Sequence, residues 1–235
     1  MRAGLPSNLK AIFFDAGGTL VHLDCARLGQ CLSDELGCEL ALDSFPRAQS
    51  LAMTTIARLT VEGAGTTDQL KAQFYTTLLP HLGLTEDKLS PAVECALRLA
   101  QAEMLWRSAD PAAAPVLREL KRRGFALGVI SNSDGRLERS FALAGLTEHF
   151  DFFIDSFVVG VEKPDPAIFR FALERAGVAP HEAAYVGDIY PIDVLGARRA
   201  GLLPILYDPA DLEANADCLR IRHLDELLTL FPAAP

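Results

Sequence analysis

The sequence predicts an α/β fold, a doubly wound parallel sheet with an inserted α-helical cap domain. Short apolar segments without polar alternation recur along the chain, as in parallel strands that are buried on both faces. After Ala109 these segments alternate with helical patterns, which is typical of doubly wound sheets. Residues 22–106 carry helical patterns alone. We therefore predict a sheet core from residues 1–21 and 107–235, and a cap from residues 22–106.

The first predicted strand lies within residues 11–20, AIFFDAGGTL. The three residues before Asp15 are apolar, so Asp15 falls at the carboxyl end of a buried strand, where open α/β sheets bind their ligands. Gly17 and Gly18 follow, and glycines let a backbone turn sharply and bring its N–H groups close to an anion. A carboxylate beside such a loop suits a nucleophile or a metal ligand, although aspartate before two glycines is also an ordinary turn residue.

The cap segment predicts four helices, which together would form a small bundle. The first follows a leucine stripe from Leu28 that Gly37 interrupts near its end. The others are a second helix that stops at residues 63–65 (GAG), a third over residues 67–80 that Pro80 ends, and a fourth over residues 91–105.

The rest of the chain predicts alternating strands and helices. Apolar runs without alternation indicate the strands, and glycines after apolar helical stripes mark the helix ends. The strands are predicted at residues 125–130, 152–155, 183–186 and 203–207, and the helices at residues 111–123, 137–143, 166–176, 192–200 and 224–231.

Composition and short sequence features argue against several classes of protein. The net charge of −9 argues against nucleic-acid binding, because phosphate backbones are held by clustered lysine and arginine. No apolar run approaches the roughly 18 residues of a membrane span. The start of the chain, RAGLP at residues 2–6, does not resemble a secretory signal. The 5 cysteines form no Cys-x-x-Cys pair and are expected to be reduced thiols, so we expect a cytoplasmic protein.

Polar residues follow several of the predicted strands, and a parallel sheet would bring them to one edge. Each has an ordinary interpretation by itself: Ser131-Asn132 as a turn, Lys163 as a surface lysine, and Asp193 as a helix cap. Asp188, which directly follows Gly187 at a strand end, is harder to explain in this way. Their coincidence at one edge favours a functional site.

Four short motifs occur in order: FDAGGTL at residues 14–20, VISN at residues 129–132, Lys163-Pro164, and VGD at residues 186–188 followed by Asp193. This set resembles the haloacid dehalogenase-like (HAD) hydrolase superfamily, and a helical insertion after the first motif resembles its subfamily I. The resemblance implies a Rossmann-like core and hydrolysis of phosphate monoesters through an aspartyl-phosphate.

The resemblance also implies residue roles, which overlap. Asp15 would be the nucleophile, with Ser131 and Lys163 as the other catalytic residues. Mg²⁺ would be the cofactor, because a hard cation prefers oxygen ligands. The implied metal ligands are Asp15, Gly17 through its carbonyl, Asp188 and Asp193. The implied substrate-binding residues are Gly17, Gly18, Ser131, Asn132 and Lys163. The expected partner is a small phosphorylated metabolite, with no nucleic acid or membrane, and the protein is expected to be a monomer or homodimer.

One position departs from the phosphatase pattern. Phosphatases of the superfamily usually carry a second aspartate two residues after the nucleophile, which acts as acid and base, and Gly17 occupies that position here. Loss of such a group typically costs about 10²–10⁴ in rate. One alternative is a 2-haloacid dehalogenase, whose leaving halide needs no proton and whose halide-binding arginine would correspond roughly to Arg47. Another is a non-catalytic protein that binds a phosphorylated metabolite or a protein partner.

A dinucleotide-binding oxidoreductase is the alternative from a different class. Gly17 and Gly18 do follow a predicted strand, but the sequence lacks G-x-G-x-x-G, and Asp15 would repel a pyrophosphate. The roles of Arg47 and His22 stay open at this stage.

Overall fold

The structure is a computed structural model, and it describes residues 8–64 and 66–232. The chain divides into two compact units, Met1–His22 with Ala109–Pro235, and Leu23–Ser108. We call them the core unit and the cap unit. Gly65, at the predicted end of the second cap helix, and the N-terminal residues considered for a secretory signal lie outside the described residues. None of the helices in the described part of the chain has the length and apolar character that crossing a bilayer requires.

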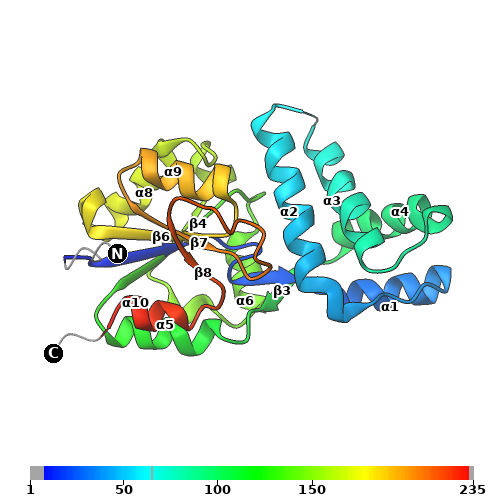
Figure 1. Cartoon of the computed structure of the whole chain (residues 1–235), viewed down its shortest axis with the longest axis horizontal. Coiled ribbons are helices and arrows are strands. Elements are labelled where there is room, and N and C mark those ends of the chain that lie inside the picture. Colours follow the sequence, from blue (N-terminus) through cyan, green and yellow to red (C-terminus); the bar gives the residue numbers. More distant parts are fainter. Residues whose placement is uncertain (1–7, 65, 233–235) are drawn as a thin grey trace. The chain divides into compact units, whose positions relative to one another are not determined.

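The core unit contains a six-stranded parallel sheet in the order β5-β4-β1-β6-β7-β8, which confirms the predicted fold class (Figure 1). The strand order reverses direction around β1, as it does in doubly wound sheets. The strands are β1 (Ala11–Phe14), β4 (Ala126–Ser131), β5 (Phe152–Asp155), β6 (Ala183–Gly187), β7 (Leu203–Tyr207) and β8 (Leu219–Ile221).

The register of the sheet brings the ends of β1, β4 and β6 within two residues of one another. Phe14, the last residue of β1, pairs with Val129 of β4 and Val186 of β6. All four residues of β1 are fully buried, as expected for a central strand with helices on both faces. The backbone N–H of Asp15 then donates to the carbonyl of Val186 over 2.8 Å, which fixes Asp15 at this edge.

Helices cover both faces of the sheet. Figure 1 shows α8 (Pro166–Ala176) and α9 (Leu195–Arg199) on one face, and α5 (Ala113–Arg122) and α10 (Glu226–Leu230) on the other. Asp165 begins α8 by accepting a hydrogen bond from the N–H of Ala167. Shorter elements complete the core unit: α6 (Leu137–Leu143), α7 (Ser156–Val159), 3₁₀ turns at Thr147–His149 and Pro180–Glu182, and a π-helical turn at Tyr190–Val194.

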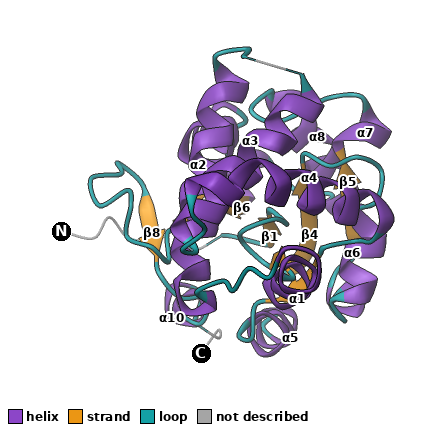
Figure 2. Cartoon of the chain, turned by 90° about the vertical axis from the view of Figure 1, so that its right-hand side faces the viewer, coloured by secondary structure: helices purple, strands orange, loops and turns teal. Residues whose placement is uncertain are grey.

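The cap unit is mostly helical, and its helices are drawn in purple in Figure 2. Asp24 caps the start of its first helix, and Gly37 ends that helix in the left-handed conformation. The helices share one apolar core, to which Leu28, Leu32 and Leu78 each contribute a fully buried side chain. The elements are α1 (Cys25–Leu36), a 3₁₀ turn (Leu42–Ser44), α2 (Phe45–Val61), α3 (Thr67–His81) and α4 (Glu86–Ala102).

Several predicted boundaries were wrong. Pro80 lies inside α3, in its last turn, and α4 begins at Glu86, so that Pro91 is inside it. Residues 192–200 do not form one helix, because a π-helical turn precedes the short α9. Short elements were also missed, since three or four residues carry too little pattern: α7, β8, and the two-stranded sheet of β2 (Val21–Leu23) and β3 (Trp106–Ala109).

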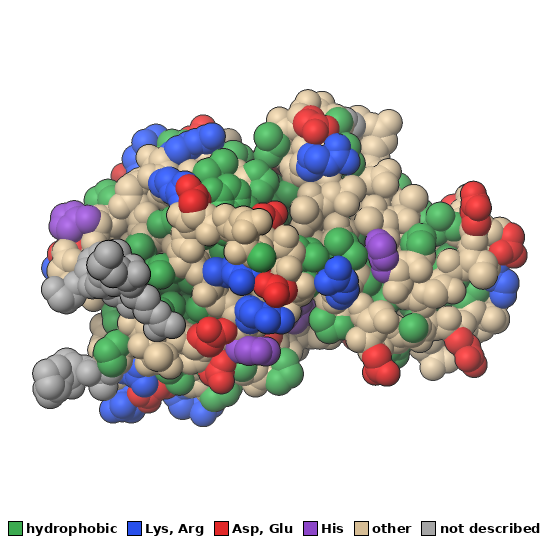
Figure 3. Space-filling model, in the orientation of Figure 1, with side chains coloured by type: hydrophobic (Ala, Val, Ile, Leu, Met, Phe, Trp, Pro, Cys, Tyr) green, Lys and Arg blue, Asp and Glu red, His purple; other side chains and the backbone are tan. Residues whose placement is uncertain are grey.

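Charged side chains of both signs are mixed on the surface. On the face shown in Figure 3, lysine and arginine side chains lie among aspartates and glutamates and do not gather into one basic area. Many of them form ion pairs, such as Arg122 with Glu119 at 2.6 Å and Arg198 with Asp217 at 2.9 Å.

Candidate active site

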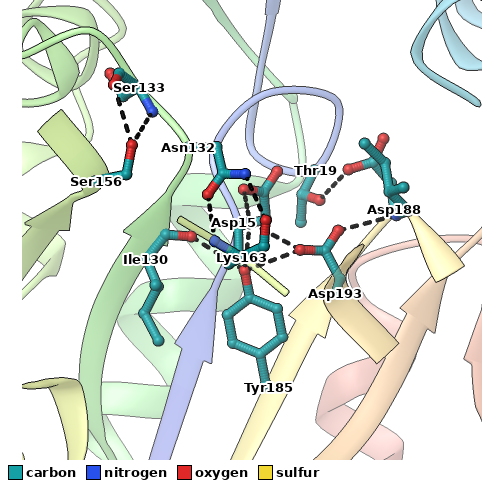
Figure 4. A network of polar contacts seen from close by, with 11 residues as sticks. Asp15, Thr19, Ile130, Asn132, Ser133, Ser156, Lys163, Tyr185, Asp188 and Asp193 are labelled. Atoms are coloured by element: carbon teal, nitrogen blue, oxygen red, sulfur yellow. Dashed lines mark hydrogen bonds and ion pairs between the residues drawn. The ribbon is translucent and has the colours of Figure 1, made fainter. Parts of the chain in front are cut away.

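Lys163 is the center of a buried polar network at the carboxyl edge of the sheet (Figure 4). Its Nζ donates to Oδ1 of Asp15 at 2.5 Å and to Oδ1 of Asp193 at 2.7 Å. The Lys163 and Asp193 side chains are almost completely buried, and Asp15 is 5% exposed. Lys163 is therefore no surface lysine. It is a fixed positive charge between two carboxylates.

Tyr185 completes the environment of the ammonium group, and none of the sequence motifs points to it. Lys163 Nζ donates to the Tyr185 hydroxyl at 2.8 Å. The hydroxyl in turn lies 3.0 Å from the carbonyl oxygen of Ile130 and 3.2 Å from Asp193 Oδ1, either of which can accept its proton. The three N–H groups of the Lys163 ammonium thus have three partners. One of these partners, the Tyr185 hydroxyl, also contacts the backbone of β4. A tyrosine inside a buried strand gives the only signal, since its hydroxyl must find a partner.

Asn132 holds the backbone of Lys163. Its side-chain amide donates to the Lys163 carbonyl at 2.9 Å, and its side-chain oxygen accepts from the Lys163 N–H at 2.7 Å. The side chain of Asn132 therefore joins the loop after β4 to the loop that carries Lys163. Ser131 is the last residue of β4 and is buried beside this contact. The substrate-binding role of Asn132 stays a prediction. The structure shows that its side chain also holds the loop that carries Lys163.

Asp188 lies just after β6 and is held by Thr19. The Thr19 hydroxyl donates to Asp188 Oδ1 at 3.0 Å, and Thr19 is fully buried. Gly18 has φ +91°, and a Cβ at this position would lie 2.4 Å from Asp188 Oδ2. Glycine is needed here for its backbone conformation and for the space that the carboxylate occupies.

Asp193 belongs to the π-helical turn and does not cap a helix. Its Oδ2 accepts from the backbone N–H of Ile189 at 2.9 Å, while Oδ1 faces Lys163. A Cβ at Gly187 would lie 2.4 Å from the Asp193 carboxyl carbon, so a glycine at the end of β6 is also required for close packing. π-Helical turns occur frequently at functional sites.

The network shifts the pKa values of its members. Burial raises the pKa of Asp15 to about 6, with Asp193 adding to the rise and Lys163 opposing it. Burial, followed by the charges of Asp15 and Asp193, raises the pKa of Asp188 well above its usual value. Burial alone would lower the pKa of Lys163, but the same two carboxylates raise it, so the ammonium stays charged. One ammonium does not balance three carboxylates.

The carboxylates of Asp15, Asp188 and Asp193 fit a divalent cation. One oxygen of each lies within 4.8 Å of the others. Such an all-oxygen set suits a hard cation such as Mg²⁺. The negative charges of Asp15 and Asp193 contribute to the raised pKa of Asp188. A cation at this position would neutralize this negative charge. The donor set therefore agrees with the predicted cofactor.

The structure brings together the predicted polar site residues Asp15, Asn132, Lys163, Asp188 and Asp193, and Ser131 directly precedes Asn132 at the end of β4. Gly17 lies in the loop between Asp15 and Thr19. Its backbone pairs with that of Val21 as an isolated β-bridge. His22 pairs with Asp110 at 3.7 Å within the core unit. Arg47 is exposed on α2 of the cap unit.

Comparisons with known proteins agree with this site. Residues 9–201 match the haloacid dehalogenase-like hydrolase family. Phosphoserine phosphatase of Thermus thermophilus is 45% identical over 122 residues, 50% of this chain and 49% of that protein. Haloacid dehalogenase-like hydrolase domain-containing protein 3 of Mus musculus is 42% identical over 120 residues, 50% of this chain and 48% of that protein. The matches to these curated relatives thus span about half of each protein.

Solved structures extend the similarity over nearly the whole chain. The crystal structure of a HAD phosphatase from Thermococcus onnurineus has a TM-score of 0.62 and 27% sequence identity, and covers 96% of this chain and 99% of that chain. The family match includes every residue of the network, from Asp15 to Asp193. The chain therefore belongs to the haloacid dehalogenase-like hydrolases.

Proposed function

We propose that the protein is a Mg²⁺-dependent phosphatase of small phosphate monoesters that acts through an aspartyl-phosphate. The observation that carries this proposal is the contact of the buried Asp15 carboxylate with the Lys163 ammonium, beside the two further carboxylates. This arrangement provides a nucleophile, a fixed positive charge and oxygen ligands at one point. The phosphatase names of relatives in the same family add support.

The chain's residues would perform the reaction in two displacements. Lys163 holds Oδ1 of Asp15, and the other carboxylate oxygen is left to attack phosphorus. A bond forms between this oxygen and phosphorus, and the bond from phosphorus to the alcohol oxygen breaks. Water then attacks the phosphoryl group, which releases inorganic phosphate and restores the carboxylate. Bound Mg²⁺ would reduce the repulsion between the carboxylates and the phosphate.

Gly17 sets the expected preference for leaving groups. Gly17 has no side chain that could donate a proton to the departing alkoxide. Esters of acidic alcohols and phenols leave without this help, so they would be the better substrates. The three-carboxylate cluster favors this chemistry over that of a metal-independent dehalogenase, which has no need of acidic metal ligands.

The test is release of p-nitrophenol from p-nitrophenyl phosphate, with Mg²⁺ and then with EDTA. We expect hydrolysis that requires the metal and is lost in Asp15→Asn, while the circular dichroism spectrum of that variant stays native. Chloride release from 2-chloropropionate is measured in parallel. Retained hydrolysis in a folded Asp15→Asn variant would refute the mechanism, and chloride release without phosphate hydrolysis would assign the protein to the dehalogenases.

A further inference from the structure

The cap unit holds a group of reactive side chains of its own. Cys31 of α1 and Cys95 of α4 have their Sγ atoms 3.2 Å apart, although 64 residues separate them in the chain. Both cysteines belong to the apolar core of the cap unit. Cys31 Sγ also donates to Oε1 of Glu35 at 3.5 Å. Cys31 therefore contacts both a second thiol and a carboxylate.

Glu35 connects the thiol pair to solvent. Its side chain is 46% exposed, and its other carboxylate oxygen accepts from Arg98 at 2.5 Å. The hydrogen bond from Cys31 and the charge of Arg98 lower the pKa of Glu35, so the carboxylate is ionized and accepts the hydrogen bond of the Cys31 thiol. Burial and the contact with Cys31 raise the pKa of Cys95 to about 12, which keeps that thiol protonated.

We propose that Cys31 and Cys95 form a reversible disulfide, which links α1 to α4, when the protein meets a hydroperoxide. The separation of the sulfur atoms supports this over a metal site. Thiolates that share a tetrahedral zinc with bonds of about 2.3 Å lie about 3.8 Å apart, farther than these two. The only carboxylate in the group is already paired with Arg98. Closing the disulfide to about 2.05 Å requires only a small movement of two side chains that already touch.

The oxidation proceeds in two steps. Cys31 is 8% exposed and Cys95 is 1% exposed, so the peroxide reaches Cys31 first. Cys31 sulfur attacks the peroxide and breaks its O–O bond; its proton passes through Glu35 to the departing alkoxide, which leaves as an alcohol. Cys95 sulfur then attacks the sulfenic acid on Cys31, and the hydroxyl leaves as water with the Cys95 proton. The two thiols lose two electrons, which reduce the peroxide.

The product would cross-link the two ends of the cap unit. α1 is its first helix and α4 its last, and the disulfide closes the chain between them. A closed loop of this length restricts the unfolded chain, so the oxidized cap unit should unfold at a higher temperature than the reduced one. A dithiol reductant would reverse the change. This inference does not depend on the proposed phosphatase activity.

The experiment uses the full chain treated with hydrogen peroxide, then alkylated after unfolding and mapped by mass spectrometry. We expect two fewer free thiols, a Cys31–Cys95 linked peptide, a raised melting temperature, and reversal of all three by dithiothreitol. The linked peptide should be absent from Cys31→Ser and Cys95→Ser. Cys38→Ala is the matched control, because Cys38 is buried in the same core but its thiol contacts the Leu36 carbonyl; this variant should still form the disulfide.

Three results would overturn the proposal, and the first two come from peptide mapping of the unmodified chain, so they do not depend on the folding of a variant. The first is that all thiols stay free, or that Cys31 proceeds to sulfinic acid without a link. The second is a disulfide between other cysteines. The third is one equivalent of zinc in the untreated protein that is lost in Cys31→Ser, which would make this group a metal site.

Discussion

Replacing Gly18 by alanine should damage the candidate active site far more than the fold. The added Cβ would lie 2.4 Å from Asp188 Oδ2, whereas ordinary contacts begin at 3.4 Å. Asp188 must therefore retreat by about 1 Å, away from the Thr19 hydroxyl that holds it, and a misplacement of about 1 Å in a catalytic group can cost about 10²-fold in rate. We expect Gly18→Ala to lower kcat/KM for p-nitrophenyl phosphate by about that factor.

Gly124 offers a closely matched control for this substitution. Its φ is +90°, against +91° for Gly18, and a Cβ there would meet nothing within 4 Å. Alanine in a left-handed conformation costs roughly 1–2 kcal/mol at either position. Gly124→Ala should therefore lose that much stability while keeping its activity per folded molecule.

The assay compares urea unfolding with Mg²⁺-dependent hydrolysis for both variants. The expected result is a loss of unfolding free energy in both proteins, with the loss of activity confined to Gly18→Ala. Equal activity in both folded variants would refute the reasoning, because it would mean that the position of the Asp188 carboxylate does not matter. A metal titration of Gly18→Ala followed by calorimetry should show weakened Mg²⁺ binding in parallel.

Other substitutions test separate parts of the site. Gly17→Asp should raise activity on alkyl phosphates, by up to about 10²–10⁴, relative to p-nitrophenyl phosphate; no gain in a folded variant would show that another group serves as the acid. Tyr185→Phe removes one of the three partners of the Lys163 ammonium and the side-chain contact of the Ile130 carbonyl, so it should lower the unfolding free energy by about 1–3 kcal/mol, together with kcat. Unchanged stability and kcat would exclude the positioning role. Asn132→Ala breaks two hydrogen bonds to the Lys163 backbone and should reduce kcat at least tenfold, measured with p-nitrophenyl phosphate; native kcat would contradict this.

Most strands of the sheet could be predicted because their sequences have a clear apolar pattern. Strands such as β5 and β7 are apolar runs bounded by turn residues, and their bounds agree with the prediction. β8 was missed because it lies at the edge of the sheet, where only Ile221 is buried, and its alternating pattern resembles a loop. The helix stop expected at Pro80 failed because the last turn of α3 accommodates the proline.

The polar residues of the site could be predicted for a topological reason. Parallel strands end at one edge, so the convergence of Asp15, Lys163 and Asp188 follows from the order of strands and loops along the chain. Tyr185 could not be predicted, because the direction of its hydroxyl depends on how β6 pairs with β1. The space requirement at Gly18 could not be predicted either, because it depends on Asp188, a residue 170 positions further along the chain. Contacts of this kind arise only from the assembled fold.

The insertion of the cap unit after β1 also has a consequence for chain entropy. β1 must pair with β4, and Ala11 meets Ala126 in the finished sheet. The inserted Leu23–Ser108 lengthens the loop between them from about 29 to about 115 residues, which is about two doublings. Closing the longer loop costs only about 1.2 kcal/mol more, because the cost grows with the logarithm of length. The central strand can thus be separated from the rest of its sheet by an entire helical unit at a small cost in stability.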